Sequence, residues 1–298
     1  MFSVNIIWYM FFAGAGSGLS FVVFFLDSFV RCFRPHLYAS YRPLVAPGHL
    51  VGIVCVICGA VFLVFDLGRV DRLLELLVDP SVTVLATGAW FLALFLALTA
   101  LQMLLRLRFA ERVPKVVHIA VRWASALSAL AVMLYVGLLL QDLRSVHFWN
   151  SPLLPAILVL SSLSGGVALL MLISFFRQAD GVPLRLMAQL SGTHLPLIVC
   201  ESLLLAAYVA LALHGSPAAA ESAAELVSGD YLLPFWGGVV ACGIAVPLGV
   251  EWLTHRKATW SLTAVYALML LAGTLAIRYC FLMVGTHPDV QLASSLAL

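Results

Sequence analysis

The sequence predicts an all-α integral membrane protein that crosses the bilayer eight times. Of its 298 residues, 63% are hydrophobic and only 10% are charged, and its mean hydropathy is +1.08. A soluble protein of this length has no interior large enough to hide so much apolar surface, whereas a membrane protein exposes that surface to lipid. The formal net charge of +2 is too small to indicate a nucleic-acid partner.

Eight apolar segments are long enough to span the bilayer, because a spanning helix needs about 20 mostly apolar residues. Their approximate bounds are 4–27, 47–66, 82–105, 116–141, 152–176, 191–214, 232–253 and 259–285. No soluble domain, low-complexity linker or convincing repeat separates them. We therefore expect residues 1–298 to form a single integral membrane domain.

Prolines and small residues mark details of these segments. Three prolines lie near predicted helix starts, where a missing N–H costs little: Pro47, Pro152 and Pro234. Pro196 and Pro247 lie inside predicted helices and should kink them. The small-residue clusters at 14–18 and 164–166 should let neighbouring helices approach closely.

Basic residues are distributed unequally between the two sets of loops. The loops after the first, third, fifth and seventh segments hold eleven Lys and Arg residues, and the opposite loops hold three: Arg69, Arg72 and Arg144. The positive-inside rule then places the first set in the cytoplasm and both termini outside. No basic residue precedes the first apolar run, so we expect that helix to be retained rather than cleaved as a signal peptide.

Hydrogen-bonding side chains from four segments are predicted near the outer face. They are Asn5 and Tyr9, Asp66, Tyr135 and Gln141, and Arg278 and Tyr279. An interfacial belt would explain aromatic residues such as Trp8, Trp149 and Trp236. It explains the true charges of Asp66 and Arg278 less well, and we therefore favour a functional site in this layer.

Ionisable side chains also lie deeper in the membrane, where they are costly and often functional. They are Asp27, His49, His118, Arg122, His194, Glu201 and Glu251. Glu201 lies near the middle of its segment, and His194 lies two turns earlier on the same face. With His49 as a further candidate, these residues form a candidate proton path from the cytoplasm. The alternative is that each is buried against a partner from another helix.

Metal and haem sites find little support in the sequence. The six cysteines lie mostly in apolar runs, and Cys55 and Cys58 form a C-x-x-C without the second pair that a zinc site needs, so we expect no disulfide and no metal. A b-type haem would need two His at one depth on facing helices. The cytoplasmic positions of His49, His118 and His194 keep that alternative open, but the spacing for two haems and the C-x-x-C-H motif are both absent.

A layer of phenol, carboxylate, guanidinium and amide groups suits an amphiphile with a polar head and a lipid tail. A quinone fits this description, because its carbonyl oxygens need hydrogen-bond donors and its reduction requires two protons. A tyrosine can donate to the oxygen and a carboxylate can exchange the proton with water. Composition alone does not separate a quinone from another lipid or a transported solute.

Several motifs resemble those of one family of membrane proteins. "WYMFFAGAGSG" (8–18) is similar to an aromatic, glycine-rich first helix, and "DLGRVDR" (66–72) resembles a D-L-G-R-P signature with Val70 in place of Pro. "DPSVTVLATGAW" (79–90) is similar to S-P-M-S-W-G-x-W, with Thr87 where Trp is usual. The family is NrfD/PsrC, the membrane subunits of polysulfide-reductase-type and related molybdoenzyme complexes.

The resemblance continues to the C-terminal segments. "YVGLLL" (135–140) is similar to Y-T-G-x-L-L, and residues 148–169 resemble the W-N…L-P…S-x-x-G stretch that follows it. "FWGGVVACGIAVPL" (235–248) and "LAGTLAIRYCFLMVG" (271–285) resemble the last two helices. Each motif alone is weak, and it is their order and spacing over eight segments that support the resemblance.

The resemblance implies a subunit of a bacterial or archaeal cytoplasmic membrane with a quinone site near the outer face, and menaquinone is the expected quinone. It implies no haem or iron–sulfur cluster in this chain. The expected partners are a ferredoxin-like, four-cluster iron–sulfur subunit docked on the outer face and a molybdopterin catalytic subunit beyond it. By position, Tyr135 resembles the family's quinone-site tyrosine, and Tyr9 falls where some members have a histidine, with Asn5 one turn away.

The predicted function is that of a quinone-reactive membrane anchor. Tyr135, with Tyr9 or Asn5, would bond the head group, and Asp66 would exchange its proton with the outer phase. Arg69, from the D-L-G-R positions, or Arg278, from the last helix, would orient Asp66. Three alternatives stay open: a haem b anchor, a proton-translocating or transport subunit that uses Glu201 and His194, and a purely structural anchor.

Overall fold

The computed structural model describes residues 4–33, 38–68, 84–108, 112–143, 146–178, 184–254 and 259–285. Regular structure in these ranges is entirely helical: α1 (Val4–Phe33), α2 (Tyr38–Leu67), α4 (Val84–Arg108), α5 (Lys115–Asp142), α6 (Leu153–Phe176), α7 (Leu184–Leu213), α8 (Pro217–Ser228), the π-helix η3 (Pro234–Ala245), α9 (Val246–Thr254) and α10 (Trp260–Val284). Eight helical spans in the described residues are long and apolar enough to cross a membrane, which confirms the predicted fold class.

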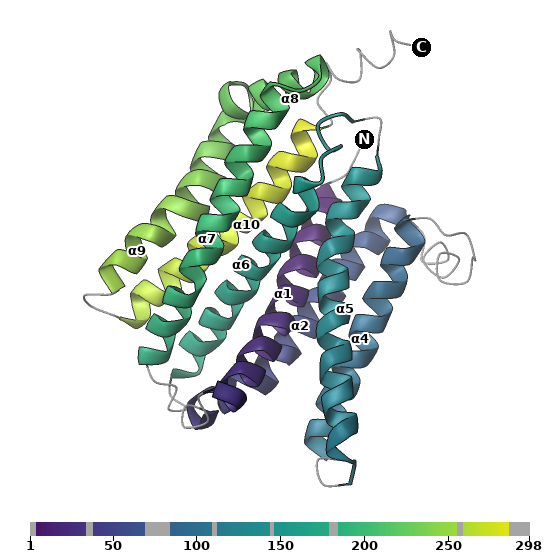
Figure 1. Cartoon of the computed structure of the whole chain (residues 1–298), viewed down its shortest axis with the longest axis vertical. Helices are drawn as coiled ribbons and strands as arrows, with labels where there is room; N and C mark the ends of the chain where they lie inside the picture. Colours follow the sequence, from purple (N-terminus) through teal and green to yellow (C-terminus); the bar gives the residue numbers. More distant parts are fainter. Residues whose placement is uncertain are drawn as a thin grey trace.

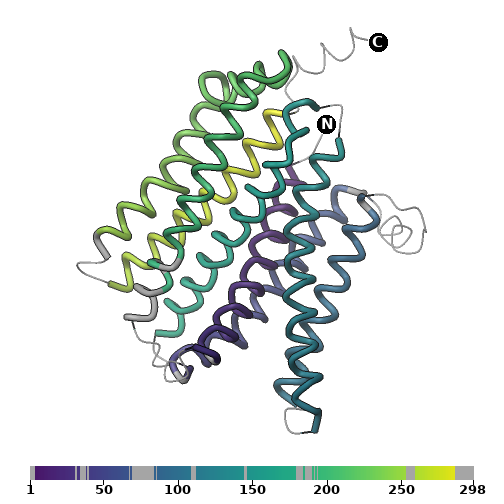
Figure 2. The backbone as a smooth tube through the Cα atoms, in the orientation of Figure 1, coloured from purple at the N-terminus to yellow at the C-terminus, as the bar shows by residue number. Residues whose placement is uncertain are grey.

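Helix α1 runs through the middle of the bundle, where it contacts α2, α5, α6 and α10 (Figure 1). The pair α4 and α5 lies on one side of it, and α7 and α9 lie on the other. Helix α1 begins and α10 ends at the same end of the bundle, where the short α8 also lies (Figure 2). We call this the α8 end. The sequence assigned it to the outer face of the membrane.

The predicted helix bounds are close except where helices extend beyond the apolar segments. Helix α2 begins at Tyr38, so Pro43 and Pro47 lie inside it rather than at its start. Helix α7 also begins early, at Leu184. Hydropathy locates the part of a helix that lies in lipid, and polar residues that continue the helix beyond the lipid core escape that signal.

The sequence reading missed helix α8, which is too short and too polar to span the membrane. Ser216 caps its N-terminus by accepting a hydrogen bond from the Ala219 N–H at 3.3 Å, and Pro217 occupies the first helical position. Both are ordinary helix-start signals. The helix thus closes one end of the bundle between α7 and η3.

The seventh span is a π-helix followed by an α-helix, and Pro247 is the second residue of the α-helical part. π-Helices are rare and occur mostly as single turns, frequently at functional sites. This one packs closely on α10: a Cβ added at Gly273 would lie 2.3 Å from the Cα of Gly243. The absence of side chains at both positions permits this approach of two backbones.

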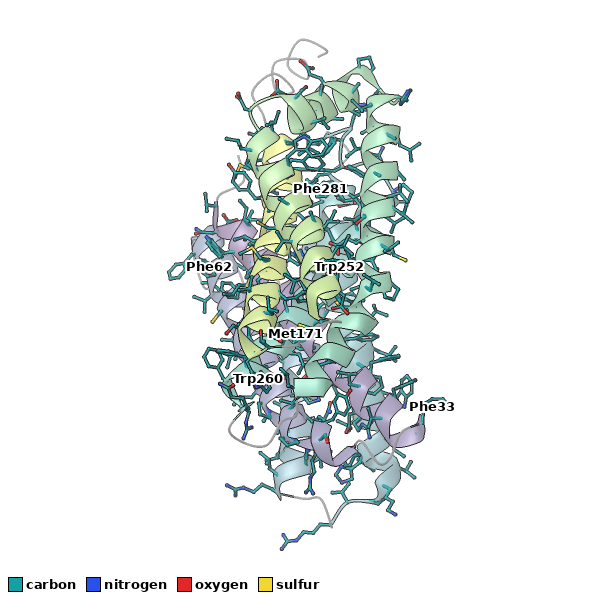
Figure 3. All side chains as sticks on the ribbon, turned by 90° about the vertical axis from the view of Figure 1, so that its left-hand side faces the viewer. Phe33, Phe62, Met171, Trp252, Trp260 and Phe281 are labelled. Atoms are coloured by element: carbon teal, nitrogen blue, oxygen red, sulfur yellow. The ribbon has the colours of Figure 1, made fainter. Side chains whose placement is uncertain are left out.

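The predicted small-residue clusters bring α1 and α6 together. A Cβ at Gly18 would lie 2.0 Å from the carbonyl oxygen of Ser162, and one at Gly166 would lie 2.3 Å from the carbonyl carbon of Gly18. The outer surface, by contrast, is covered with apolar side chains along its length (Figure 3). Trp252 is 62% exposed whereas Phe281 is buried, as expected for a bundle that is surrounded by lipid.

Candidate functional site

A cavity of about 700 Å³ lies between α4 and α5 near the α8 end. We call it the tyrosine cavity. It is lined by Val84, Thr87, Phe91, Ala131, Leu134, Tyr135, Leu138, Gln141, Asp142 and Asn150. A few polar groups on largely apolar walls are typical of sites for small amphiphilic molecules, and the volume is in the usual range for them.

Tyr135 enters the cavity because helical spacing places it on the same face of α5 as Ala131 and Leu138. Its side chain is 3% exposed and packs against α4 at Gly88. A Cβ at Gly88 would lie 1.8 Å from Cζ of the phenol ring. Glycine at this position therefore provides the space that the ring occupies.

Tyr9 lies behind Tyr135, on α1, and is 1% exposed. The two phenol groups lie close enough to interact electrostatically. Tyr135 thus has one edge on the cavity and its hydroxyl near a second hydroxyl that is buried in the bundle. Asn5, half-buried, lies one turn nearer the start of α1.

Asp66 lies in the last turn of α2, half-buried, at the α8 end of the bundle. The helix ends at Gly68, whose φ of 71° is left-handed and whose N–H donates to the carbonyl of Val64 at 3.1 Å. This is the ordinary glycine termination of a helix, and it explains the L-G of the D-L-G-R motif. The described cavity lining does not include Asp66, and Arg69 lies outside the described residues.

Arg278 is fully buried between α1, α6 and α10. Its guanidinium donates to the carbonyls of Met10 at 3.0 Å and Thr274 at 2.7 Å, and to the hydroxyls of Ser161 at 3.1 Å and Ser162 at 2.8 Å. A Cβ at Gly14 would lie 2.5 Å from its Nη2. The structure therefore places this residue in the centre of the bundle and outside the described lining of the tyrosine cavity.

Glu201 is buried on α7 and accepts a hydrogen bond from Ser164 Oγ at 2.8 Å. Ser161 is a further hydrogen-bonding neighbour, and the carboxylate is attracted electrostatically to Arg278. Serines of α6 thus connect the carboxyl group of Glu201 with the guanidinium of Arg278 in the middle of the bundle. The π-helix η3 contributes Gly243 and neighbouring residues to the space beside Glu201.

His194 and His49 belong to separate clusters. The Nδ1 of His194 lies 2.9 Å from the hydroxyl of Tyr266 on α10. The Nε2 of His49, on α2, lies 3.1 Å from Nε2 of Gln102 on α4. His194 shares a helix with Glu201, as the sequence indicated, but His49 lies in the other half of the bundle.

The loop between α5 and α6 carries site features that the sequence reading did not assign. Trp149 was expected in an interfacial belt, but it is fully buried and its indole N–H donates to the carbonyl of Phe281 at 2.7 Å. The hydroxyl of Tyr208 donates to the carbonyl of Phe148, the residue before Trp149. These two bonds hold the loop against α7 and α10, and they place Asn150 beside the cavity. The adjacent Trp149 and Asn150, which form the W-N pair of the motif, were the sequence signal that could have pointed to this loop.

Fold and site together define a polytopic helical membrane protein with a largely apolar cavity, which holds a few polar groups, near one end. The sequence matches the family described as "Polysulphide reductase, NrfD" over residues 1–287. It is 26% identical to a subunit of the polysulfide reductase of Wolinella succinogenes in an alignment 296 positions long, which covers 93% of this protein and 92% of that subunit. It is 29% identical to Protein NrfD of Escherichia coli in an alignment 299 positions long, with the same coverage of both proteins. The protein belongs to the NrfD/polysulphide reductase family.

Proposed function

We propose that this protein is the quinone-reactive membrane subunit of an oxidoreductase complex in the cytoplasmic membrane. The observation that carries the proposal is the tyrosine cavity, in which a buried phenol and two amides meet apolar walls. Family membership supports it, because a relative that aligns along almost the whole sequence is part of a polysulfide reductase. The quinone, most simply menaquinone, is a substrate that enters from the bilayer.

The polar groups of the cavity match the needs of a quinone head. Tyr135 donates a hydrogen bond to one carbonyl oxygen while Tyr9 fixes the orientation of that phenol. Gln141 and Asn150 supply amide donors. Reduction of a quinone takes up two electrons and two protons, and Asp66 or the cavity carboxylate Asp142 exchanges those protons with the phase at the α8 end.

The tail of the quinone leaves between α4 and α5. Phe91, Leu134 and Leu138 line the cavity and are also 39%, 38% and 47% exposed on the outer surface. That surface faces lipid in a membrane, so an isoprenoid tail passes from the cavity into the bilayer over apolar side chains. This arrangement favours a lipid-soluble substrate over a water-soluble solute.

Electrons reach or leave the quinone through a partner at the α8 end. We assign this role to a four-cluster, ferredoxin-like iron–sulfur subunit, with a molybdopterin catalytic subunit beyond it. The cavity lies near the α8 end, which keeps the transfer distance short for a partner that docks there. Co-purification with this protein, followed by metal analysis of the partner, tests the assignment.

Three substitutions and one control test the quinone site in the assembled complex. Tyr135→Phe and Asp66→Asn should each lower quinol-dependent turnover while electron transfer from a soluble dye to the catalytic subunit is unchanged. Ala131→Trp should fill the cavity and block the quinone, whereas Leu127→Trp, one turn away at a site 60% exposed, should not. If Tyr135→Phe, Asp66→Asn and Ala131→Trp all leave quinol turnover intact, the site lies elsewhere.

A proton-translocating role is a second candidate, because Glu201 and Arg278 form a charged cluster with serines at the membrane centre. In this reading His194 supplies protons to Glu201, and His49 belongs to a separate entry point. Glu201→Gln should then abolish proton release coupled to quinol turnover in vesicles but leave uncoupled turnover. A haem b anchor would instead give a b-type band in the reduced-minus-oxidised spectrum of the purified protein.

A further inference from the structure

A second cavity, of about 510 Å³, lies between α1, α4 and α5 at the end of the bundle opposite α8. We propose that it binds the phosphate of an anionic phospholipid from the leaflet at that end. We call it the basic cavity, because it is lined by one acid and four residues that are or can become cationic: Asp27, Arg106, Lys115, His118 and Arg122.

The single acid of the basic cavity is already neutralised. Nη2 of Arg122 lies 3.3 Å from Oδ2 of Asp27 and donates to the hydroxyl of Ser28 at 2.8 Å. Within the described residues, no ion pair joins Arg106 or Lys115 to an acid. The cavity therefore carries an excess of positive charge, which favours an anion over a neutral or zwitterionic group.

Two buried polar atoms in the lining lack a partner within the described residues. They are Nε2 of His118 and Oε1 of Gln102. A buried polar group without a partner costs about 1–3 kcal/mol. Both side chains border the cavity, so a small rotation of either side chain would bring its unpartnered atom to a ligand that is bound there. The imidazole can donate to a phosphate oxygen, and the amide of Gln102 can do the same after exchange of its oxygen and nitrogen, which are hard to tell apart.

The depth of the cavity matches a lipid phosphate. Lys115 is the first residue of α5 and Arg106 lies in the last turn of α4. Arg122 lies seven residues further into α5, about 10 Å at the rise of an α-helix. The cavity thus begins at the helix ends, the level of the headgroups, and extends inward along α5.

The walls of the cavity explain why the anion is a lipid. Ile119 lines it and is 52% exposed on the outer surface, so an acyl tail attached to the bound phosphate continues over apolar, lipid-facing side chains. The positive-inside rule places this end in the cytoplasm, where the leaflet is anionic. That rule accounts for basic loops in general, but it does not require a cavity with buried, unpartnered polar atoms.

Lipid exchange on the purified full-length protein tests this proposal. The protein is stripped of lipid in detergent and titrated with phosphatidylglycerol, phosphatidylcholine or inorganic phosphate, and bound lipid is counted by native mass spectrometry. We expect phosphatidylglycerol to bind at least about 10-fold more tightly than phosphatidylcholine. Inorganic phosphate should not displace it at millimolar concentration, and displacement would overturn the proposal in favour of a soluble anion.

Two charge-matched variants separate the cavity from general surface charge. Arg106→Gln with Lys115→Gln removes two lining cations, and Arg108→Gln with Arg112→Gln removes two exposed cations from the same helix ends. The first pair should abolish the preference for phosphatidylglycerol and the second should keep it. Equal losses in both pairs, or no preference in the unmodified protein, would show that the cavity is no lipid site. Unchanged thermal unfolding of each variant checks the fold.

Discussion

Gly88 of α4 lies directly against the phenol ring of Tyr135 on α5. A Cβ at Gly88 would lie 1.8 Å from Cζ and 2.0 and 2.3 Å from the two Cε atoms of that ring. A ring is less adaptable than the end of a flexible side chain, so an alanine at this position must move Tyr135 or separate the helices. The glycine therefore decides where the central phenol of the tyrosine cavity lies.

Gly88→Ala should lower quinol-dependent turnover about 10-fold. Overpacking of this kind costs about 1–3 kcal/mol, whereas alanine in place of glycine within a helix is favourable by about 1 kcal/mol. Any loss must then come from the contact with Tyr135. Gly249→Ala in α9 is the matched control, because nothing lies within 4 Å of a Cβ there. Equal activity in the two variants would mean that the ring is not fixed where the structure has it.

Tyr9→Phe should have a smaller effect that depends on Tyr135. The variant removes the Tyr9 hydroxyl, which interacts with Tyr135. Loss of an interaction worth about one hydrogen bond, about 1 kcal/mol, should lower quinol affinity about fivefold. In a Tyr135→Phe background the same change should have almost no further effect, because the partner hydroxyl is gone. Affinities of the two single variants and the double variant test this coupling. Additive losses would show that Tyr9 contacts the quinone directly.

The sequence predicted the eight spans well because length and hydropathy alone decide them. It also predicted that Tyr135 and Asp66 lie near one end of the bundle, where the structure places them. The sequence did not reveal which of the polar side chains at this depth point into the cavity and which point into the centre of the bundle. Tyr135 lines the tyrosine cavity, but Arg278, which the motif placed with it, is bonded to α1 and α6. Depth follows from residue number along a helix, whereas the direction of a side chain depends on which helices are neighbours.

The buried loop shows a second limit of sequence reading. Trp149 lies in the sequence near the end of an apolar segment, where interfacial tryptophans are common, yet it is buried and its indole donates a hydrogen bond to α10. In a helix the spacing of apolar residues indicates which face is buried, but a connecting loop has no such repeat. The burial of Trp149 therefore depends on tertiary contacts that the sequence does not show. The π-helix is similar, because the sequence 234–245 has no local signal that separates it from an α-helix.

Arg278→Lys should destabilise the whole bundle. The guanidinium makes four hydrogen bonds to groups on three helices, and an ammonium cannot reach them in the same geometry. The substitution keeps the charge but leaves some of these buried carbonyl and hydroxyl groups without a donor, at about 1–3 kcal/mol each, and Tm of the full-length protein in detergent should fall clearly. Arg112→Lys, at an exposed site, is the control.

The Arg278→Lys variant also tests the role that family resemblance gives to this residue. An unchanged Tm together with lost quinone affinity would show that Arg278 acts on the quinone. A fall in Tm with normal affinity in the folded fraction would show that it holds the bundle together. Arg278→Met, which removes the cation, should lower Tm further, because it leaves the buried carboxylate of Glu201 without its cation. Adding Glu201→Gln to that variant should raise Tm part of the way back.

Trp149→Phe should weaken quinone binding through the position of Asn150. The substitution keeps an aromatic ring in the packed site but removes the indole N–H that donates to Phe281 at 2.7 Å. The loop that carries Asn150 then loses one of the two bonds described above, and quinol KM should rise about fivefold, the equivalent of one hydrogen bond. Trp236→Phe is a close match, since its indole N–H also donates to a backbone carbonyl, that of Val227 at 3.0 Å. Trp236 lies away from the described cavity lining, so its variant should keep a normal KM. A rise in both variants would indicate a general loss of stability rather than a role for the loop at the site.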